Sequence, residues 1–149
     1  MTHPAPTPLA SLADTQRFAD TLASTLAPGD VLALDGDLGA GKTHFVQALA
    51  KSLGSTATVS SPTFTLIHEY RFPNGKIIHA DFYRIQDENE LYEIGLPDLM
   101  TPPHLCIFEW ACKFPSILPP HTRYFRMDIL APDARSIQEY PSCPDSRPF

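Results

Sequence analysis

The eight residues Gly-Asp-Leu-Gly-Ala-Gly-Lys-Thr, at positions 36–43, constrain the fold of this chain more than any other segment. They match the pattern G-x-x-x-x-G-K-[ST], in which a strand ends, the chain turns sharply and a helix begins. The backbone N–H groups of such a turn surround a phosphate, and glycine lets the backbone approach it closely. Lys42 then supplies a positive charge to the outer phosphates, and Thr43 offers a hydroxyl to a magnesium ion. The predicted phosphate-binding residues are Gly36, Asp37, Leu38, Gly39, Ala40, Gly41, Lys42 and Thr43.

The segments on both sides of this loop have the patterns that the motif requires. Residues 31–34, Val-Leu-Ala-Leu, form a short apolar run typical of a buried parallel strand. After the loop, apolar residues from Phe45 to Leu53 recur at helical spacing, and Gly54 is a typical helix end. The loop is therefore predicted to join a buried strand to an amphipathic helix.

Further strand patterns indicate a mixed α/β fold. Residues 63–70 and 76–81 are strand-like, and the Pro-Asn-Gly sequence at 73–75 between them is a strong hairpin signal. Residues 105–108 are a second apolar run, and residues 123–130 alternate as a half-exposed strand does. We therefore expect the three-layer α/β fold of P-loop NTPases, with a mostly parallel central sheet that carries an antiparallel hairpin.

The two ends of the chain differ from its middle. Residues 1–8 contain three prolines and are predicted to form a loose arm, and residues 11–26 are predicted to form a helix. From position 141 onward the chain is rich in proline, serine and charge, which predicts a disordered tail. We expect one domain over residues 1–140, followed by that tail at 141–149.

Composition limits the partners that this chain can bind directly. It has 149 residues and a formal net charge of −6 at pH 7, so no broad basic face is expected to bind nucleic acid. An RNA substrate would then be held by a partner protein. Cys106, Cys112 and Cys143 are odd in number and irregularly spaced, which argues against a disulfide framework and for a reducing compartment. Without a transmembrane-length apolar segment or a signal peptide, a cytoplasmic protein with no membrane partner is predicted.

A phosphate-binding loop of this kind needs a carboxylate at the end of a neighbouring strand. Such a carboxylate binds magnesium, directly or through water, or orients the attacking water. Two acids qualify: Asp81 follows residues 77–80, and Glu109 follows residues 105–108. Their spacing does not indicate which of the two serves the metal or the attacking water, and either could instead be an ordinary acid at the end of a strand.

Three other candidates each have two interpretations. Residues 61–65, Ser-Pro-Thr-Phe-Thr, either sense the outer phosphate through their hydroxyls or form a plain turn. Trp110, directly after a candidate acid, either contacts a partner or packs in the core. Thr15 is a candidate contact for the nucleotide base, although a solvated helix residue is the favoured interpretation.

Five blocks of sequence, in this order and at suitable distances, resemble those of one family. The blocks are Gly-Asp-Leu-Gly-Ala-Gly-Lys-Thr at 36–43, Ser-Pro-Thr-Phe-Thr-Leu at 61–66, His-Ala-Asp-Phe-Tyr-Arg at 79–84, Glu-Leu-Tyr-Glu-Ile-Gly-Leu at 90–96 and Phe-Glu-Trp at 108–110. On these blocks the chain is similar to the TsaE (YjeE) family, the bacterial ATPases of tRNA threonylcarbamoyladenosine biosynthesis, over about residues 10–138.

The resemblance implies a magnesium-dependent ATPase that binds ATP and Mg²⁺. Arg84 and Arg135 are the only arginines near the five blocks and neither is an evident arginine finger, so the chain is predicted to be weakly active alone and activated by partners. The implied partners are TsaD and TsaB, which attach the threonylcarbamoyl group to the adenosine next to the anticodon, so that tRNA is contacted only through the complex. Thr43 and Glu109 would be magnesium ligands, Asp81 would act near the γ-phosphate, and Arg135 would lie near the base. His44 stands where the family commonly has a second threonine, beside the α-phosphate.

Two other functions stay open at this point. A small-molecule P-loop kinase would need an acceptor site and usually an arginine-rich lid, and no arginine cluster is present in the sequence. A nucleotide-dependent assembly module with negligible turnover has the same motifs as an ATPase. Because the chain has no Asn-Lys-x-Asp sequence for reading guanine, ATP is favoured over GTP.

Overall fold

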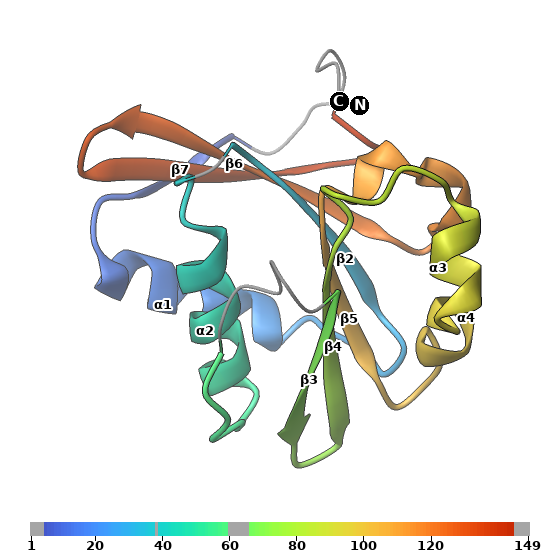
Figure 1. Ribbon diagram of the computed structural model, residues 1–149. Coiled ribbons are helices and arrows are strands. Elements are labelled where there is room, and N and C mark those ends of the chain that lie inside the picture. Colours follow the sequence, from blue (N-terminus) through green and yellow to red (C-terminus); the bar gives the residue numbers. More distant parts are fainter. Residues whose placement is uncertain (1–4, 38, 60–65, 145–149) are drawn as a thin grey trace.

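The computed structural model describes residues 5–37, 39–59 and 66–144. In this part of the chain a single seven-stranded sheet is covered by helices on both faces (Figure 1). The elements are, in chain order, β1 (Thr7–Leu9), α1 (Leu12–Ala23), β2 (Val31–Asp35), α2 (Lys42–Ser52), β3 (Ile67–Phe72), β4 (Gly75–Asp81), α3 (Asn89–Glu93), α4 (Leu96–Leu99), β5 (Leu105–Glu109), the 3-10 turns η1 (Ala111–Lys113) and η2 (Pro115–Ile117), β6 (Arg123–Ala131) and β7 (Ala134–Tyr140).

The middle of the sheet is parallel. The strand order is β1-β7-β6-β2-β5-β4-β3, and the four adjacent strands β6, β2, β5 and β4 run in one direction. Every residue of β2 and of β5 is buried, as expected for strands that are covered on both faces. Because parallel strands bring their carboxyl ends to one edge, that edge is where an open α/β sheet binds its ligand.

Both sides of the sheet end in antiparallel pairs. Strands β3 and β4 pair from Ile67↔Ala80 to Phe72↔Gly75, which confirms the predicted hairpin. On the other side, β7 pairs with β6, and β1 pairs with β7; neither β7 nor β1 was predicted from the sequence. The loose arm predicted at residues 1–8 is therefore wrong for Thr7 and Pro8, which lie in β1, although a proline is well tolerated in such an edge strand.

Two apolar clusters, one on each face of the sheet, form the core. The first lies under α1 and α2, and the second lies under α3, α4 and the 3-10 turns (Figure 1). The largest fully buried side chains are Phe45, Leu49 and Phe125 in the first cluster, and Phe82, Leu91 and Phe108 in the second. The expected α/β architecture with a mostly parallel centre is confirmed.

The two helices of the first layer form close to where they were predicted. Helix α1 covers Leu12–Ala23, three residues short of the expected end, and α2 begins directly after the glycine-rich loop at Lys42. Within the described ranges, no helix has the length and apolar character that crossing a bilayer requires.

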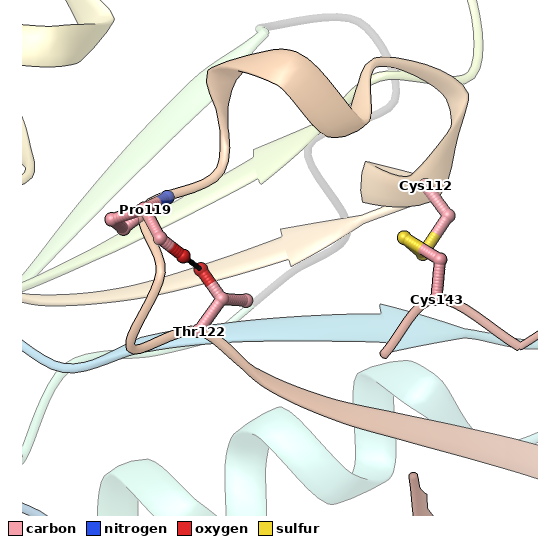
Figure 2. The surroundings of a disulfide bond; sticks show 4 residues. All are labelled: Cys112, Pro119, Thr122 and Cys143. Carbon is pink, nitrogen blue, oxygen red and sulfur yellow. Dashed lines mark hydrogen bonds between the residues drawn. A yellow bond between two sulfur atoms is a disulfide. The ribbon is translucent and has the colours of Figure 1, made fainter. Parts of the chain in front are cut away.

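One cysteine pair contradicts the sequence-based prediction. Cys112 in η1 and Cys143 after β7 form a disulfide, with their Cα atoms 5.6 Å apart (Figure 2). Strand β7 runs antiparallel to β6 and so brings the end of the chain back to the turns that precede β6. The pairing depends on this return of the chain, and the spacing of the cysteines in the sequence does not reveal it. Cys106 is free and buried. The predicted disordered tail thus contains one anchored residue, and its residues 145–149 lie outside the described part of the chain.

Candidate functional site

A cleft of about 700 Å³ lies at the carboxyl edge of the parallel strands. Its walls come from the starts of α1 and α2, the ends of β4 and β5, and the hairpin of β6 and β7. This volume is typical of a pocket for a ligand of nucleotide size. The predicted site residues that line the cleft are Thr15, Gly39, Gly41, Lys42, Thr43, His44, Asp81, Glu109 and Arg135.

The glycine-rich loop turns tightly against the hairpin of β6 and β7. Gly36 has φ of 151°, and a Cβ atom there would lie 2.7 Å from the carbonyl oxygen of Met127. Gly41 has φ of 98° and leads directly into α2. Because the first N–H groups of a helix have no partner within the helix, the start of α2 offers donors to an anion. Of the other loop positions, Asp37 is exposed, Ala40 is buried and Leu38 lies outside the described residues.

Lys42 lies folded into the loop and is almost fully buried. Its Nζ donates a hydrogen bond of 2.6 Å to the carbonyl oxygen of Gly36, and it lies 3.8 Å from Oε1 of Glu109. The same ammonium group lies 4.7 Å from the centre of the Trp110 ring. Burial lowers the pKa of Lys42, while the charge of Glu109 opposes that shift. The charges of Asp81, Asp35 and Asp37 also oppose the shift, so Lys42 lies among acids at the wall of the cleft.

The two candidate acids lie side by side on neighbouring strands. Asp81 ends β4 and Glu109 ends β5, and the two residues are register partners in the parallel pair. Oδ1 of Asp81 accepts a hydrogen bond of 2.9 Å from the backbone N–H of Tyr83. Burial raises the pKa of Asp81, and the nearby charge of Glu109 raises it further. Both acids therefore border the cleft, and their separate roles stay predictions.

His79 is a site residue that the sequence analysis did not single out. It is fully buried, and its Nε2 lies 2.6 Å from Oε2 of Glu109. Its other ring nitrogen, Nδ1, lies 3.2 Å from the hydroxyl of Tyr70 on β3. The signal available in the sequence is alternation: His79 and Asp81 are two residues apart on one strand and so share a face of the sheet.

Trp110 has a left-handed backbone conformation, with φ of 56°. Such a conformation is uncommon for a bulky residue and is often found at functional sites. Its ring packs against Tyr83, with the ring centres 5.0 Å apart, and against the second apolar cluster. The packing interpretation of Trp110 is thus confirmed, and a contact with a partner stays a prediction.

Three predicted contacts from other elements also lie at the cleft. Thr15 is only 7% exposed, so the favoured interpretation of a solvated helix residue is wrong. Arg135 on β7 donates from Nε to the carbonyl oxygen of Gly39 over 2.9 Å and from Nη1 to carbonyl groups of the β6–β7 turn. His44 is exposed on the first turn of α2.

The side chains at the cleft suit a hard cation such as magnesium. Thr43, Asp81 and Glu109 supply a hydroxyl and carboxylates, which are oxygen ligands. Among the described residues, no group of three or more His, Cys, Asp or Glu side chains forms a complete metal site. Magnesium does not need such a cage, since it usually binds one or two protein groups together with phosphate oxygens and water. Residues 61–65, the candidate phosphate sensor, lie outside the described part of the chain.

Comparison with known proteins gives one consistent result. Residues 9–137 match the family described as "Threonylcarbamoyl adenosine biosynthesis protein TsaE". A Bacillus subtilis protein named tRNA threonylcarbamoyladenosine biosynthesis protein TsaE is 40% identical over 124 residues, which are 83% of this chain and 77% of that protein. A Rickettsia bellii protein of the same name is 35% identical over 82% of this chain and 85% of its own length.

A solved structure is also similar. The crystal structure of Bacillus subtilis YdiB superposes with a TM-score of 0.72 and 30% sequence identity, over 93% of this chain and 86% of that one. The match to the family extends from β1 into β7 and so includes the phosphate-binding pattern, the two acids and Trp110. The chain therefore belongs to the TsaE family.

Proposed function

We propose that this chain binds ATP with magnesium in the cleft and hydrolyses it, in support of threonylcarbamoyladenosine formation on tRNA. One observation carries the proposal. A complete phosphate-binding pattern opens α2, and two register-paired acids, Asp81 and Glu109, end the strands beside it. A strand, a glycine-rich loop and a helix in this order form the P-loop of many nucleotide hydrolases.

The residues of the loop would bind the phosphates. The N–H groups at the start of α2 would donate to phosphate oxygens, and Lys42 would exchange its bond to the carbonyl of Gly36 for the outer phosphates. Arg135 keeps the loop in place by donating to Gly39. Thr15 and His44 both line the cleft. Thr15 would contact the base side of the nucleotide, and His44 would lie beside the phosphates.

Thr43 and Glu109 would hold the magnesium ion, which neutralises charge on the phosphates when bound. Asp81 would orient the attacking water and accept its proton. A raised pKa suits that role, because a base acts best when its pKa approaches the working pH. The packed rings of Trp110 and Tyr83, which line the cleft, would limit the access of other water molecules from that side.

Membership of the TsaE family supports a role in tRNA modification, and we propose TsaD and TsaB as the partners. We propose the cytoplasm as the location from this role and not from the cysteines, since Cys112 and Cys143 are paired. The net charge of −6 makes direct binding of the tRNA phosphates by this chain unfavourable, which supports binding of the tRNA by the partners. Turnover by the chain alone should be slow. Arg84 and Arg135 both line the cleft, and Arg135 already donates to carbonyl groups of the loop and the β6–β7 turn. We expect a partner to supply the activating cation. Such a cation contributes roughly a thousandfold or more in other phosphate hydrolases.

The binding site is tested by calorimetry with ATP and magnesium. Lys42→Ala should weaken ATP binding by about tenfold or more, which is about 1.4 kcal/mol. Lys51→Ala is the matched control, because Lys51 is an exposed lysine in the same helix. Equal ATP affinities for the two variants would refute the assignment of the loop.

The activity is tested by phosphate release from the chain alone and with purified TsaD and TsaB. Release should rise by at least about tenfold with the partners, equivalent to about 1.4 kcal/mol of barrier. Asp81→Ala should bind ATP but hydrolyse it slowly, and Glu109→Ala should remove the magnesium dependence of binding. Full activity without partners, or no binding to the pair with ATP and magnesium present, would defeat the proposal and favour a small-molecule kinase.

A further inference from the structure

A buried row of hydrogen bonds leads from the cleft to the edge of the sheet. It crosses the three neighbouring strands β5, β4 and β3 (Figure 1). Glu109 on β5 contacts His79 on β4, His79 contacts Tyr70 on β3, and the hydroxyl of Tyr70 lies 3.2 Å from Nδ1 of His68. A buried network whose members satisfy one another's hydrogen bonds holds its side chains in one arrangement.

The chemistry of the row determines the protons on the histidine ring. A carboxylate only accepts hydrogen bonds, so Nε2 of His79 carries a proton and donates it to Oε2 of Glu109 over 2.6 Å. The other ring nitrogen, Nδ1, lies 3.2 Å from the hydroxyl of Tyr70, which is within hydrogen-bond distance. His79 is fully buried and Tyr70 is 4% exposed, so the ring is held from both sides without bulk water.

The two oxygens of Glu109 therefore have different surroundings. Oε2 is bound to His79, whereas Oε1 points towards Lys42 at 3.8 Å, longer than a hydrogen bond. Attraction between opposite charges grows as their separation falls, and it is stronger where water is excluded. A Glu109 side chain without His79 would gain by closing on Lys42, and both groups would then be withdrawn from a nucleotide.

We propose that His79 is a positioning residue that fixes Glu109, keeping Oε1 available to the magnesium ion and apart from Lys42. The inference rests on the function proposed above, since it assigns a role within that same site. Side chains that hydrogen-bond to a metal ligand and so orient it typically contribute 10- to 100-fold to metal affinity. His79 touches neither the nucleotide nor the metal in this scheme, and it acts through Glu109 alone.

The measured quantity is the magnesium coupling factor, defined as the ratio of ADP dissociation constants without and with magnesium. Calorimetry gives this ratio without relying on turnover. His79→Leu removes the donor, and the factor should fall by about tenfold or more, with ADP affinity in the absence of magnesium nearly unchanged. His79→Gln places an amide N–H near the position of Nε2 and should restore most of the factor.

Two further variants separate positioning from a general loss of stability. Ile77→Val alters a fully buried side chain on the same strand, and it should lower stability while leaving the coupling factor unchanged. His79→Asn stays polar but ends short of Glu109, so it should behave like His79→Leu and replaces it where the leucine variant does not fold.

Each outcome decides the inference. It stands when the factor falls in the leucine or asparagine variant and recovers with glutamine. It is overturned by an unchanged factor in folded His79→Leu or His79→Asn, or by an equal loss in Ile77→Val. A wild-type chain whose ADP binding ignores magnesium would overturn the proposed function itself, and this inference with it.

Discussion

Loss of the Cys112–Cys143 disulfide should lower the stability of the protein by an amount that follows from the length of the loop it closes. The bond joins residues 31 positions apart. By loop-closure entropy, a cross-link of that span disfavours the unfolded chain by about 3.7 kcal/mol near room temperature. Small domains have a total stability of roughly 5–15 kcal/mol, so the bond accounts for a large share of it. For a chain of this size, the loss corresponds to a fall of about 7–15 °C in Tm.

The assay is urea unfolding followed by far-ultraviolet circular dichroism, on the oxidised protein and on Cys143→Ser. The variant should have the lower free energy of unfolding. Ser142→Ala, an exposed change in the same segment, should match the oxidised wild type. Adding a thiol reductant should destabilise the wild type and leave Cys143→Ser unaffected, because that variant has no bond to lose.

Two results would refute this reasoning. A titration that finds three free thiols in the unfolded, unreduced protein would show that the bond does not form. Equal free energies of unfolding for the oxidised wild type and Cys143→Ser would show that the closed loop contributes nothing to stability.

Three smaller perturbations test other parts of the structure. Burial raises the pKa of Asp81 above the ordinary 3.8, so its ionisation costs stability as pH rises from the unfolded pKa through the folded one, and that cost is complete at neutral pH. Asp81→Asn should therefore be more stable than wild type in urea at pH 7, and the gain should vanish in acid below about pH 4. Burial raises the pKa of the Cys106 thiol to about 12, so iodoacetamide at pH 8 should label it in the unfolded chain only, as mass spectrometry would detect. Gly36→Ala should be destabilised by about 1–3 kcal/mol more than Gly39→Ala, since only the former Cβ would collide with the carbonyl oxygen of Met127, and unfolding in urea measures the difference.

Local sequence patterns predicted the parts of the fold that depend on neighbouring residues. The run at 31–34, the glycine-rich loop and the helix from Lys42 are encoded within one stretch of chain, and each forms in place. The Asn-Gly turn before β4 is likewise a local signal. The positions of Asp81 and Glu109 followed from these strands, because an acid that ends a parallel strand reaches the shared edge of the sheet.

The features that were missed depend on contacts between distant segments. Strand β1 is three residues long and forms because β7 lies beside it, so propensity alone could not indicate it. The Cys112–Cys143 pair depends on the return of β7 along β6. His79 resembles an ordinary strand residue until the register of β4 and β5 brings it to Glu109. Each of these required knowledge of which strands are neighbours.

Trp110 is the one tryptophan in the sequence, and its ring lies beside Lys42 and Tyr83 at the cleft. When the protein is excited at wavelengths that tyrosine does not absorb, all of its intrinsic fluorescence therefore comes from this position. Indole emission responds to nearby charge and to water, and the ammonium group 4.7 Å from the ring centre would move on binding an anion. The native protein thus carries its own optical probe of the loop, so stopped-flow mixing can follow ligand arrival on the unlabelled, unmutated chain.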